Sequence, residues 1–96
     1  MLELVISDDA EQDLIDIWKY IAEDSPVNAA RFLRKLSVKY HWLTEHSEAG
    51  LNRDDLLPNL CSFPFAKYML YYRVKANTLE LVRVLHGSRD LGMVFH

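Results

Sequence analysis

The segment Arg83 to Asp90, RVLHGSRD, concentrates a histidine, a serine, two arginines and an aspartate. His86, Ser88 and Asp90 are the residue types of a hydrolytic triad, but they stand two positions apart on one stretch of chain. On an extended strand such residues point the same way with several ångströms between them, whereas triads assemble from separated segments. No nucleophile elbow surrounds the serine. We therefore predict no catalytic triad here.

The histidines and the single cysteine do not have the spacing of a metal site. His41 and His46 are five residues apart and His86 and His96 are ten apart, so neither pair fits the i, i+4 spacing of ligands on a helix. Cys61 stands alone in an apolar stretch and is predicted to be a small core residue. The glycines match no phosphate-binding loop. We predict neither a metal nor another cofactor.

Two arginines stand inside stretches that are otherwise apolar, Arg73 and Arg83. A guanidinium group in such a place needs carboxylate or backbone partners, because an unpaired buried charge is costly. Glu80, Asp90 and the acidic face of the first predicted helix are candidate partners. Two interpretations stay open: an internal network of ion pairs, or an arginine surface that a partner recognises.

The tyrosines of the run YMLYYRV allow two interpretations as well. Aromatic side chains on a sheet can stack the bases of RNA. Strict alternation, however, places Tyr68 and Tyr72 on a core face and leaves Tyr71 and Arg73 on the opposite face. Tyr71 is therefore the tyrosine of this run that we predict to be available to a ligand or partner.

Length and charge limit the classes of function. The 96 residues are half hydrophobic, which suits one domain spanning residues 1–96. Residues 1–50 hold five Lys and Arg against ten Asp and Glu, whereas residues 51–96 hold six against four. Because nucleic-acid binders need clustered positive charge, this balance favours a protein partner that meets the second half. The sequence has no secretory signal and no apolar run of about 18 residues, so we expect a cytoplasmic protein without a membrane span.

The first half of the chain has the pattern of a strand followed by two helices. Residues 2–6 are an apolar run of strand type, and apolar spacing predicts helices over about 8–23 and 26–46. Serines precede both helices as N-caps, and a proline opens the second one. The link between the helices is so short that they must form an antiparallel hairpin.

Helical spacing also predicts which residues of the helices face the core. Trp18 and Phe32 fall on the apolar stripes of their helices and are predicted to be buried. Asp13 falls among the polar positions of the first helix and is predicted to lie outside.

The second half of the chain has the pattern of a loop and three strands. The loop covers residues 47–59, and the strands cover residues 60–65, 67–74 and 79–86. Pro64 suggests an edge or a bulge in the first of these strands. In the last strand, alternation places Leu79, Leu81, Arg83 and Leu85 on one face. The order β-α-α-β-β-β predicts an α+β domain with a helix hairpin packed on an antiparallel sheet.

The sequence resembles the ParE branch of the ParE/RelE superfamily, the toxins of bacterial type II toxin–antitoxin modules. Each motif is weak alone, but together they follow the order of the family over residues 1 to about 90. The four motifs are A-x-x-D-L-x-x-I-x-x-Y-I from Ala10 to Ile21, Gly50-x-x-Arg53, Ser62-x-Pro64 followed by Tyr68-x-Leu70-x-Tyr72-Arg73-Val74, and Arg83-Val84-Leu85-His86-Gly87 followed by Arg89-Asp90.

The resemblance implies a toxin that binds DNA gyrase, without catalysis, and that a cognate antitoxin neutralises by wrapping around it and adding to its sheet. The RelE branch implies the alternative, a ribosome-dependent mRNA endoribonuclease. In that case His86, Arg83 and Arg53 would be the catalytic groups, and His96 would be a second candidate acid. RelE toxins are strongly basic and this chain is acidic, so the ParE interpretation is favoured.

The candidate residues for contact with a partner lie in the second half of the chain, and the apolar tail LGMVFH belongs to them. That tail could pack as core, extend the sheet or contact a partner, and we favour the last two. The candidates are Arg53, Tyr71, Arg73, Arg83, His86, Arg89, Met93 and Phe95.

Overall fold

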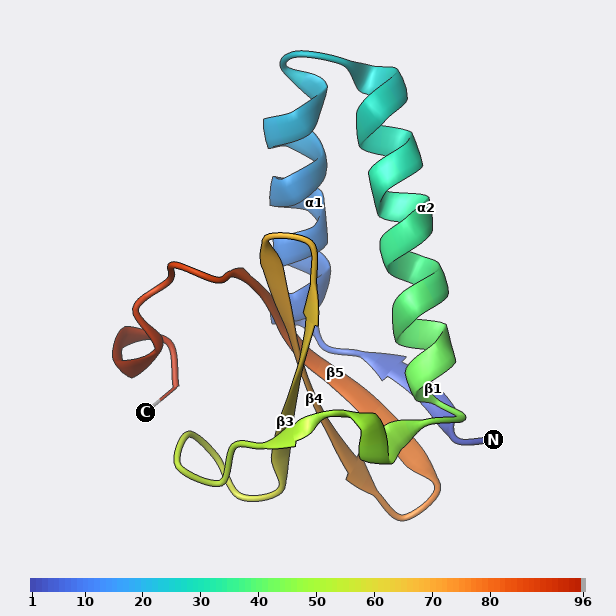
Figure 1. Ribbon diagram of the computed structural model, residues 1–96, viewed down its shortest axis with the longest axis vertical. Helices are drawn as coiled ribbons and strands as arrows, with labels where there is room; N and C mark the ends of the chain where they lie inside the picture. Colours follow the sequence, from blue (N-terminus) through green and yellow to red (C-terminus); the bar gives the residue numbers. More distant parts are fainter. Residues whose placement is uncertain (96) are drawn as a thin grey trace.

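The computed structural model describes residues 1–95, and His96 lies outside the described residues. Two helices stand on one face of a five-stranded sheet whose order is β1-β5-β4-β3-β2 (Figure 1). Strand β1 is parallel to β5, and the other pairs are antiparallel. The elements are β1 (Glu3–Ile6), α1 (Asp8–Ala22), α2 (Pro26–Leu43), a 3₁₀ turn (Ser47–Ala49), β2 (Leu51–Asn52), β3 (Leu60–Phe65), β4 (Tyr68–Lys75), β5 (Thr78–His86) and a second 3₁₀ turn (Leu91–Met93).

The α+β class and the predicted order of elements are confirmed, with three differences. The sheet is mixed rather than antiparallel, because β1 runs parallel to β5. The predicted loop contains an additional strand, β2, which pairs with Cys61 and Ser62 of β3. Helix α2 ends at Leu43 rather than near His46, because the Thr44 N–H bonds to the His41 carbonyl and tightens the last turn.

Serine caps start both helices, as the sequence predicts. The Ser7 hydroxyl accepts from the Ala10 N–H at 3.0 Å, and the Ser25 hydroxyl accepts from the Asn28 N–H at 3.1 Å. Each cap satisfies one of the N–H groups that the first turn of a helix leaves without an internal partner. The beginning of each helix is therefore fixed by local chemistry.

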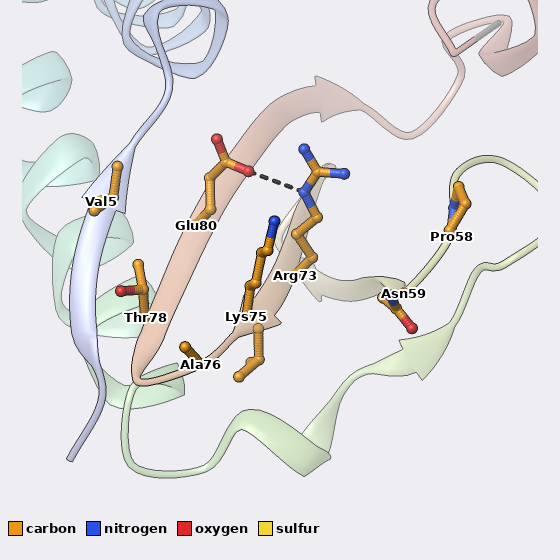
Figure 2. A pocket seen from close by; sticks show the side chains of 9 residues that line it. Val5, Pro58, Asn59, Arg73, Lys75, Ala76, Thr78 and Glu80 are labelled. Atoms are coloured by element: carbon orange, nitrogen blue, oxygen red, sulfur yellow. Dashed lines mark hydrogen bonds and ion pairs between the residues drawn. The ribbon is translucent and has the colours of Figure 1, made fainter.

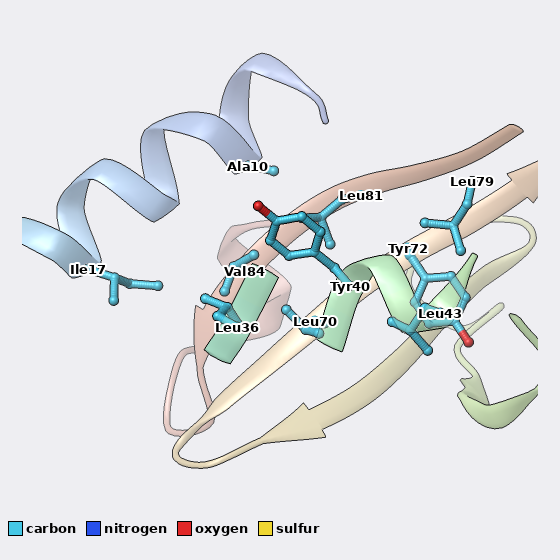
Figure 3. Packing of buried hydrophobic residues seen from close by; sticks show 10 residues of the cluster. All are labelled: Ala10, Ile17, Leu36, Tyr40, Leu43, Leu70, Tyr72, Leu79, Leu81 and Val84. Atoms are coloured by element: carbon cyan, nitrogen blue, oxygen red, sulfur yellow. The ribbon is translucent and has the colours of Figure 1, made fainter. Parts of the chain in front are cut away.

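The main core fills the space between the helices and the sheet (Figure 3). Phe32 packs against it as predicted, and the half-buried Cys61 packs against it as well. Trp18 is 43% exposed, so its predicted burial is wrong, whereas Asp13 is 9% exposed rather than outside. The buried residues of the main core are Ala10, Ile17, Leu36, Tyr40, Leu43, Leu70, Tyr72, Leu79, Leu81 and Val84.

A bulge in β5 changes which of its residues face the helices. Tyr71 pairs with Arg83 and Tyr72 pairs with Leu81, so Val82 is the extra residue. Val84 consequently joins the main core, whereas Leu85 lies in a second core on the opposite face. The prediction that Leu85 shares a face with Leu81 is wrong for this reason.

The second core covers part of the sheet face that the helices leave free. Its buried members are Leu60, Tyr71, Leu85 and Phe95, and the loop after β2 and the C-terminal tail pack around them. The tail forms a 3₁₀ turn rather than a further strand, so the predicted extension of the sheet is wrong. In Figure 1 this tail lies on the side of the sheet away from α2.

Candidate functional site

Asp13 and Arg83 form the most buried ion pair of the described residues. The Arg83 Nε and Nη2 atoms donate to the two carboxylate oxygens at 2.8 Å each, and the Val84 N–H donates to the same carboxylate at 2.9 Å. The side chains of Arg83 and Asp13 are 21% and 10% exposed. The hydrogen bond to Asp13 is the main reason why the pKa of Arg83 is raised.

The position of this pair follows from the end of β1. The last backbone bond that extends β1 along β5 runs from the Ser7 N–H to the Leu81 carbonyl, and the Ser7 hydroxyl then donates to the Val82 carbonyl at 2.8 Å. Beyond this point no strand of residues 1–95 lies beside β5 on that side, and Asp13 of α1 accepts from the Val84 N–H. The bulge at Val82 places Arg83 opposite Tyr71 and turns the Val84 side chain toward the helices.

Two further arginines of the second half of the chain are paired near the surface. The Arg73 Nε atom donates to Glu80 across β4 and β5 at 3.0 Å (Figure 2), and these side chains are 41% and 34% exposed. Arg53 donates from two atoms to Asp55 at 3.0 Å each, which raises the pKa of Arg53 and lowers that of Asp55. Of the two interpretations left open for Arg73 and Arg83, ion pairs within the chain are present, buried at Arg83 and partly exposed at Arg73.

The pairing differs from the prediction in one respect. Arg73 has the predicted partner Glu80, and Arg83 pairs with the acidic helix. Asp90, the other candidate, instead accepts from the Gly92 N–H at 3.0 Å and caps the turn in the tail. Arg89 is exposed at the end of β5, where it lines a small hollow with Asp16 and His86.

His86 is exposed at the last position of β5. Its Nδ1 atom accepts from the Ser88 N–H at 3.2 Å and lies 2.7 Å from the Ser88 hydroxyl. With Nδ1 used as an acceptor, the proton of the neutral ring is on Nε2. Tyr68 contacts the ring edge-on at 5.6 Å, and Tyr20 and Lys67 complete a hollow of about 310 Å³.

The three residues that a nuclease would use do not converge in the described part of the chain. Arg53 lies beside Tyr71 on the second-core side of the sheet, where burial raises the pKa of Tyr71 and Arg53 opposes the shift. Arg83 is bound to Asp13 of α1, and His86 is the last residue of β5. Each lies in a different environment: Arg53 is paired with Asp55, Arg83 with Asp13, and His86 contacts Ser88.

Two of the predicted contact residues lie inside the protein. Tyr71 and Phe95 meet edge to face with ring centres 5.0 Å apart, and they are 3% and 8% exposed. The assumption that both side chains face a partner is therefore wrong for this conformation, because the tail folds back over β4. Met93, in contrast, is 75% exposed at the outer side of the tail.

Sequence reasoning missed a polar contact that holds the loop before β2. The Tyr72 hydroxyl donates to the Ser47 carbonyl at 2.6 Å and accepts from the Gly50 N–H at 2.9 Å. Burial raises the pKa of Tyr72 to about 12. A side chain at Gly50 would collide with the Tyr72 hydroxyl, which gives a physical reason for glycine at this position.

Known proteins resemble this chain in sequence and in fold. A family model described as the ParE toxin of the type II toxin–antitoxin system parDE matches residues 4–91. The chain belongs to the ParE toxin family. Toxin ParE3 of Caulobacter vibrioides is 26% identical over 80 residues, which cover 82% of this chain and 80% of that protein. A solved structure titled as the chromosomal ParDE system from P. aeruginosa has a TM-score of 0.75 at 19% identity, and the match covers 90% of this chain and 96% of that one.

The ParE family match includes every strand and both long helices. It runs from the second residue of β1 to the first residue of the 3₁₀ turn in the tail. The predicted identity as a ParE-type toxin of a type II system is confirmed. None of the helices over residues 1–95 is long and apolar enough to cross a membrane, and no cluster of metal-ligating side chains occurs in this part of the chain.

Proposed function

We propose that this ParE-type toxin inhibits DNA gyrase by binding to it, without catalysis, and that a cognate antitoxin keeps it silent. The observation that carries the proposal is that arginines of this ParE-family chain are paired with carboxylates. Arg53 and Arg83, which a nuclease would direct at phosphate, are each bound to a carboxylate of the same chain. Such neutralised arginines are poorly suited to stabilise the charge of a phosphorane.

The gyrase-contacting surface that we propose lies at the end of β5 and in the tail. His86, Arg89 and Met93 are exposed there and follow one another along the chain. Arg73 and Arg53 are partly exposed and lie elsewhere, each with an acidic partner. An exposed arginine beside an exposed apolar side chain is a composition that protein interfaces favour.

A supercoiling assay with purified gyrase tests this proposal. We expect inhibition of supercoiling and accumulation of cleaved DNA that gyrase holds. Arg89→Ala should weaken inhibition about fivefold or more if this arginine is an interface anchor. The matched control is Arg34→Ala, which removes an exposed arginine from α2, a helix that lies away from the C-terminal tail (Figure 1), and should leave inhibition unchanged. Unchanged supercoiling and no cleaved DNA at high toxin excess would refute gyrase as the target.

The second candidate function is mRNA cleavage on the ribosome, and the exposed His86 is the observation that favours it. Its ring lines a hollow with Lys67 and two tyrosines, where an RNA phosphate could be bound. If this function is correct, ribosomes with bound mRNA will yield cleaved message, and His86→Ala will abolish the cleavage. Cleavage that persists in His86→Ala would remove His86 from the mechanism.

Neutralisation by an antitoxin has its own test. Co-expression of the toxin with the product of a short neighbouring reading frame should restore growth, and the two chains should co-purify. Growth arrest that persists despite a stable complex would contradict neutralisation by that partner. The result does not depend on which cellular target the toxin has.

A further inference from the structure

The charged residues of the two long helices are segregated by sign. Helix α1 holds five Asp and Glu against one Lys, whereas α2 holds four Lys and Arg and no Asp or Glu. Strand β3, which α2 contacts through Trp42 and Phe63, has no charged residue. The charge count for residues 1–50 does not show this difference, because it adds the two helices together. The surface of α2 is therefore basic, although the net charge of the chain is −3.

Three of the α2 cations form a row along the helix, which we call the α2 row. Arg31, Lys35 and Lys39 are spaced by four residues, so they follow one another over about 12 Å of helix length. Arg31 and Lys35 are exposed, and Lys39 is half-buried. No ion pair within residues 1–95 includes any of the three. The α2 row therefore presents three positive charges to a ligand.

A hollow at the start of the α2 row is lined by hydrogen-bond donors. Asn28, Arg31 and Lys35 line it together with the apolar Ile21 and Phe32, and its volume is about 240 Å³. No carboxylate of residues 1–95 lines this hollow. The guanidinium and ammonium groups can only donate, and the Asn28 amide can donate as well. Such a set of groups suits a phosphate, because the phosphate oxygens accept hydrogen bonds and carry negative charge.

Aromatic side chains hold the other end of the α2 row in place. The Lys39 Nζ atom lies 4.7 Å from the centre of the Trp42 ring and 5.5 Å from that of the Phe63 ring. The Trp42 ring also stacks on His46, with ring centres 4.2 Å apart. A cation over an aromatic face is ordered but keeps its charge, so Lys39 is preorganised for an anion. Because Lys39 and His46 already contact the Trp42 ring, this arrangement favours contact with phosphates over stacking of a base.

We propose that the α2 row binds the phosphate backbone of duplex DNA, independently of base sequence. Each of its three cations contacts a phosphate, and the hollow beside Asn28 receives one of them. Lysine is depleted in protein–protein interfaces, whereas lysine and arginine are regular donors to DNA phosphates, so an acidic protein is the less suitable partner. The choice of DNA over RNA rests on the proposed function, because gyrase holds duplex DNA. The α2 row is separate from the proposed gyrase-contacting surface.

Fluorescence anisotropy with a short labelled DNA duplex tests the proposal on the full chain in the absence of gyrase. Because three phosphates are neutralised, the logarithm of the binding constant should fall linearly with the logarithm of the salt concentration, with a slope of about −2.7. Two duplexes of unrelated sequence should bind within about twofold of each other, since phosphate contacts carry no sequence information. A failure in this assay leaves the proposed target unaffected, whereas unchanged supercoiling by gyrase leaves the DNA contact unaffected.

Two triple variants of equal net charge separate the α2 row from the overall charge of the chain. Replacement of all three row residues by glutamine should weaken DNA binding more than about tenfold and bring the salt slope close to zero. The control removes three exposed cations outside the row and should weaken binding less than about threefold, because salt screens distant charges. The control substitutions are Lys19→Gln, Lys75→Gln and Arg89→Gln.

Thermal melts confirm that both triple variants are folded. If Lys39→Gln disturbs the fold through its aromatic contacts, Arg31→Gln with Lys35→Gln is used instead, because both of these side chains are exposed. This double variant should reduce the magnitude of the salt slope by about 1.8.

Three results would overturn the proposal. One is the absence of DNA binding at low salt. Another is an equal loss of affinity in the two triple variants, because net charge rather than the α2 row would then attract the DNA. The third is tighter binding of polyglutamate, or of an RNA duplex of the same length, than of the DNA duplex, because the occupant would then be an acidic protein or an RNA.

Discussion

Arg73 and Arg83 enter the same sheet from neighbouring strands, yet the structure holds them in different ways. Arg83 is bound at two atoms to Asp13, which also accepts from the backbone of β5, and both side chains are largely buried. Arg73 reaches Glu80 with one nitrogen across the open face of the sheet. A buried, multiply bonded pair is costly to break from one side, whereas a partly solvated pair contributes little. The arginines therefore have different structural roles despite similar sequence contexts.

Removal of Asp13 is expected to have the largest effect. Asp13→Ala leaves the Arg83 guanidinium and the Val84 N–H without their acceptor, and we expect a loss of about 3–5 kcal/mol of unfolding free energy. Urea denaturation measures this loss. Asp16→Ala is the matched control, because this carboxylate lies one turn further along α1 and is exposed, so a change below about 0.5 kcal/mol is expected.

A double variant tests the cause of that loss. Asp13→Ala combined with Arg83→Met removes both charges and should recover part of the stability that Asp13→Ala alone loses. If the double variant is as unstable as the sum of the two single variants, the ion pair is not the reason for the loss.

Tyr72 is a third polar group inside the sheet, and it is neutral. Tyr72→Phe leaves the Ser47 carbonyl and the Gly50 N–H without the hydroxyl, and we expect a loss of about 1–3 kcal/mol of unfolding free energy. Amide exchange in β2 should become faster, because this contact holds the preceding loop. Tyr20→Phe removes the hydroxyl of an exposed tyrosine and serves as the control. Unchanged stability of Tyr72→Phe would show that water replaces both bonds.

The same hydroxyl predicts a dependence on alkaline pH. The pKa of Tyr72 is about 12 in the folded protein, above the ordinary value of 10. Between these values the unfolded chain releases the phenolic proton and the folded chain retains it, so stability falls as pH rises from 10 to 12. The Tyr72→Phe variant lacks this contribution and should lose less stability over that range. Parallel curves for the two proteins in denaturation from pH 9 to pH 12 would contradict the prediction.

The sequence predicts those parts of the fold that depend on interactions between residues close together in the chain. Ser7 and Ser25 start the helices through bonds within the first turn, so their positions follow from the local pattern. Burial in α1 does not follow from it, because Asp13 is buried by residues seventy positions away. Trp18 is exposed as a consequence, and apolar spacing cannot anticipate a carboxylate on the core face.

The candidate site is predictable only in part for a similar reason. The arginines in apolar stretches correctly indicate ion pairs, and Glu80 follows from the hairpin register. Tyr71 and Phe95 are hidden because the tail turns back over the sheet, which a pattern of period two cannot show. Strand β2 is only two residues long and leaves no periodic signal of its own.

The smallest effect is expected at Arg73, and it completes the comparison. A double-mutant cycle with Arg73→Met and Glu80→Gln should give a coupling free energy of about 0.2–1 kcal/mol, because both side chains are partly exposed. That coupling should shrink further in 1 M salt, since salt screens solvated charges, whereas the instability of Asp13→Ala should persist there. A coupling at Arg73 that exceeds about 2 kcal/mol and resists salt would show that water does not reach the pair. The ion pairs of Arg73 and Arg83 would then contribute similarly to stability, and the exposure of the side chains would not determine the strength of either pair.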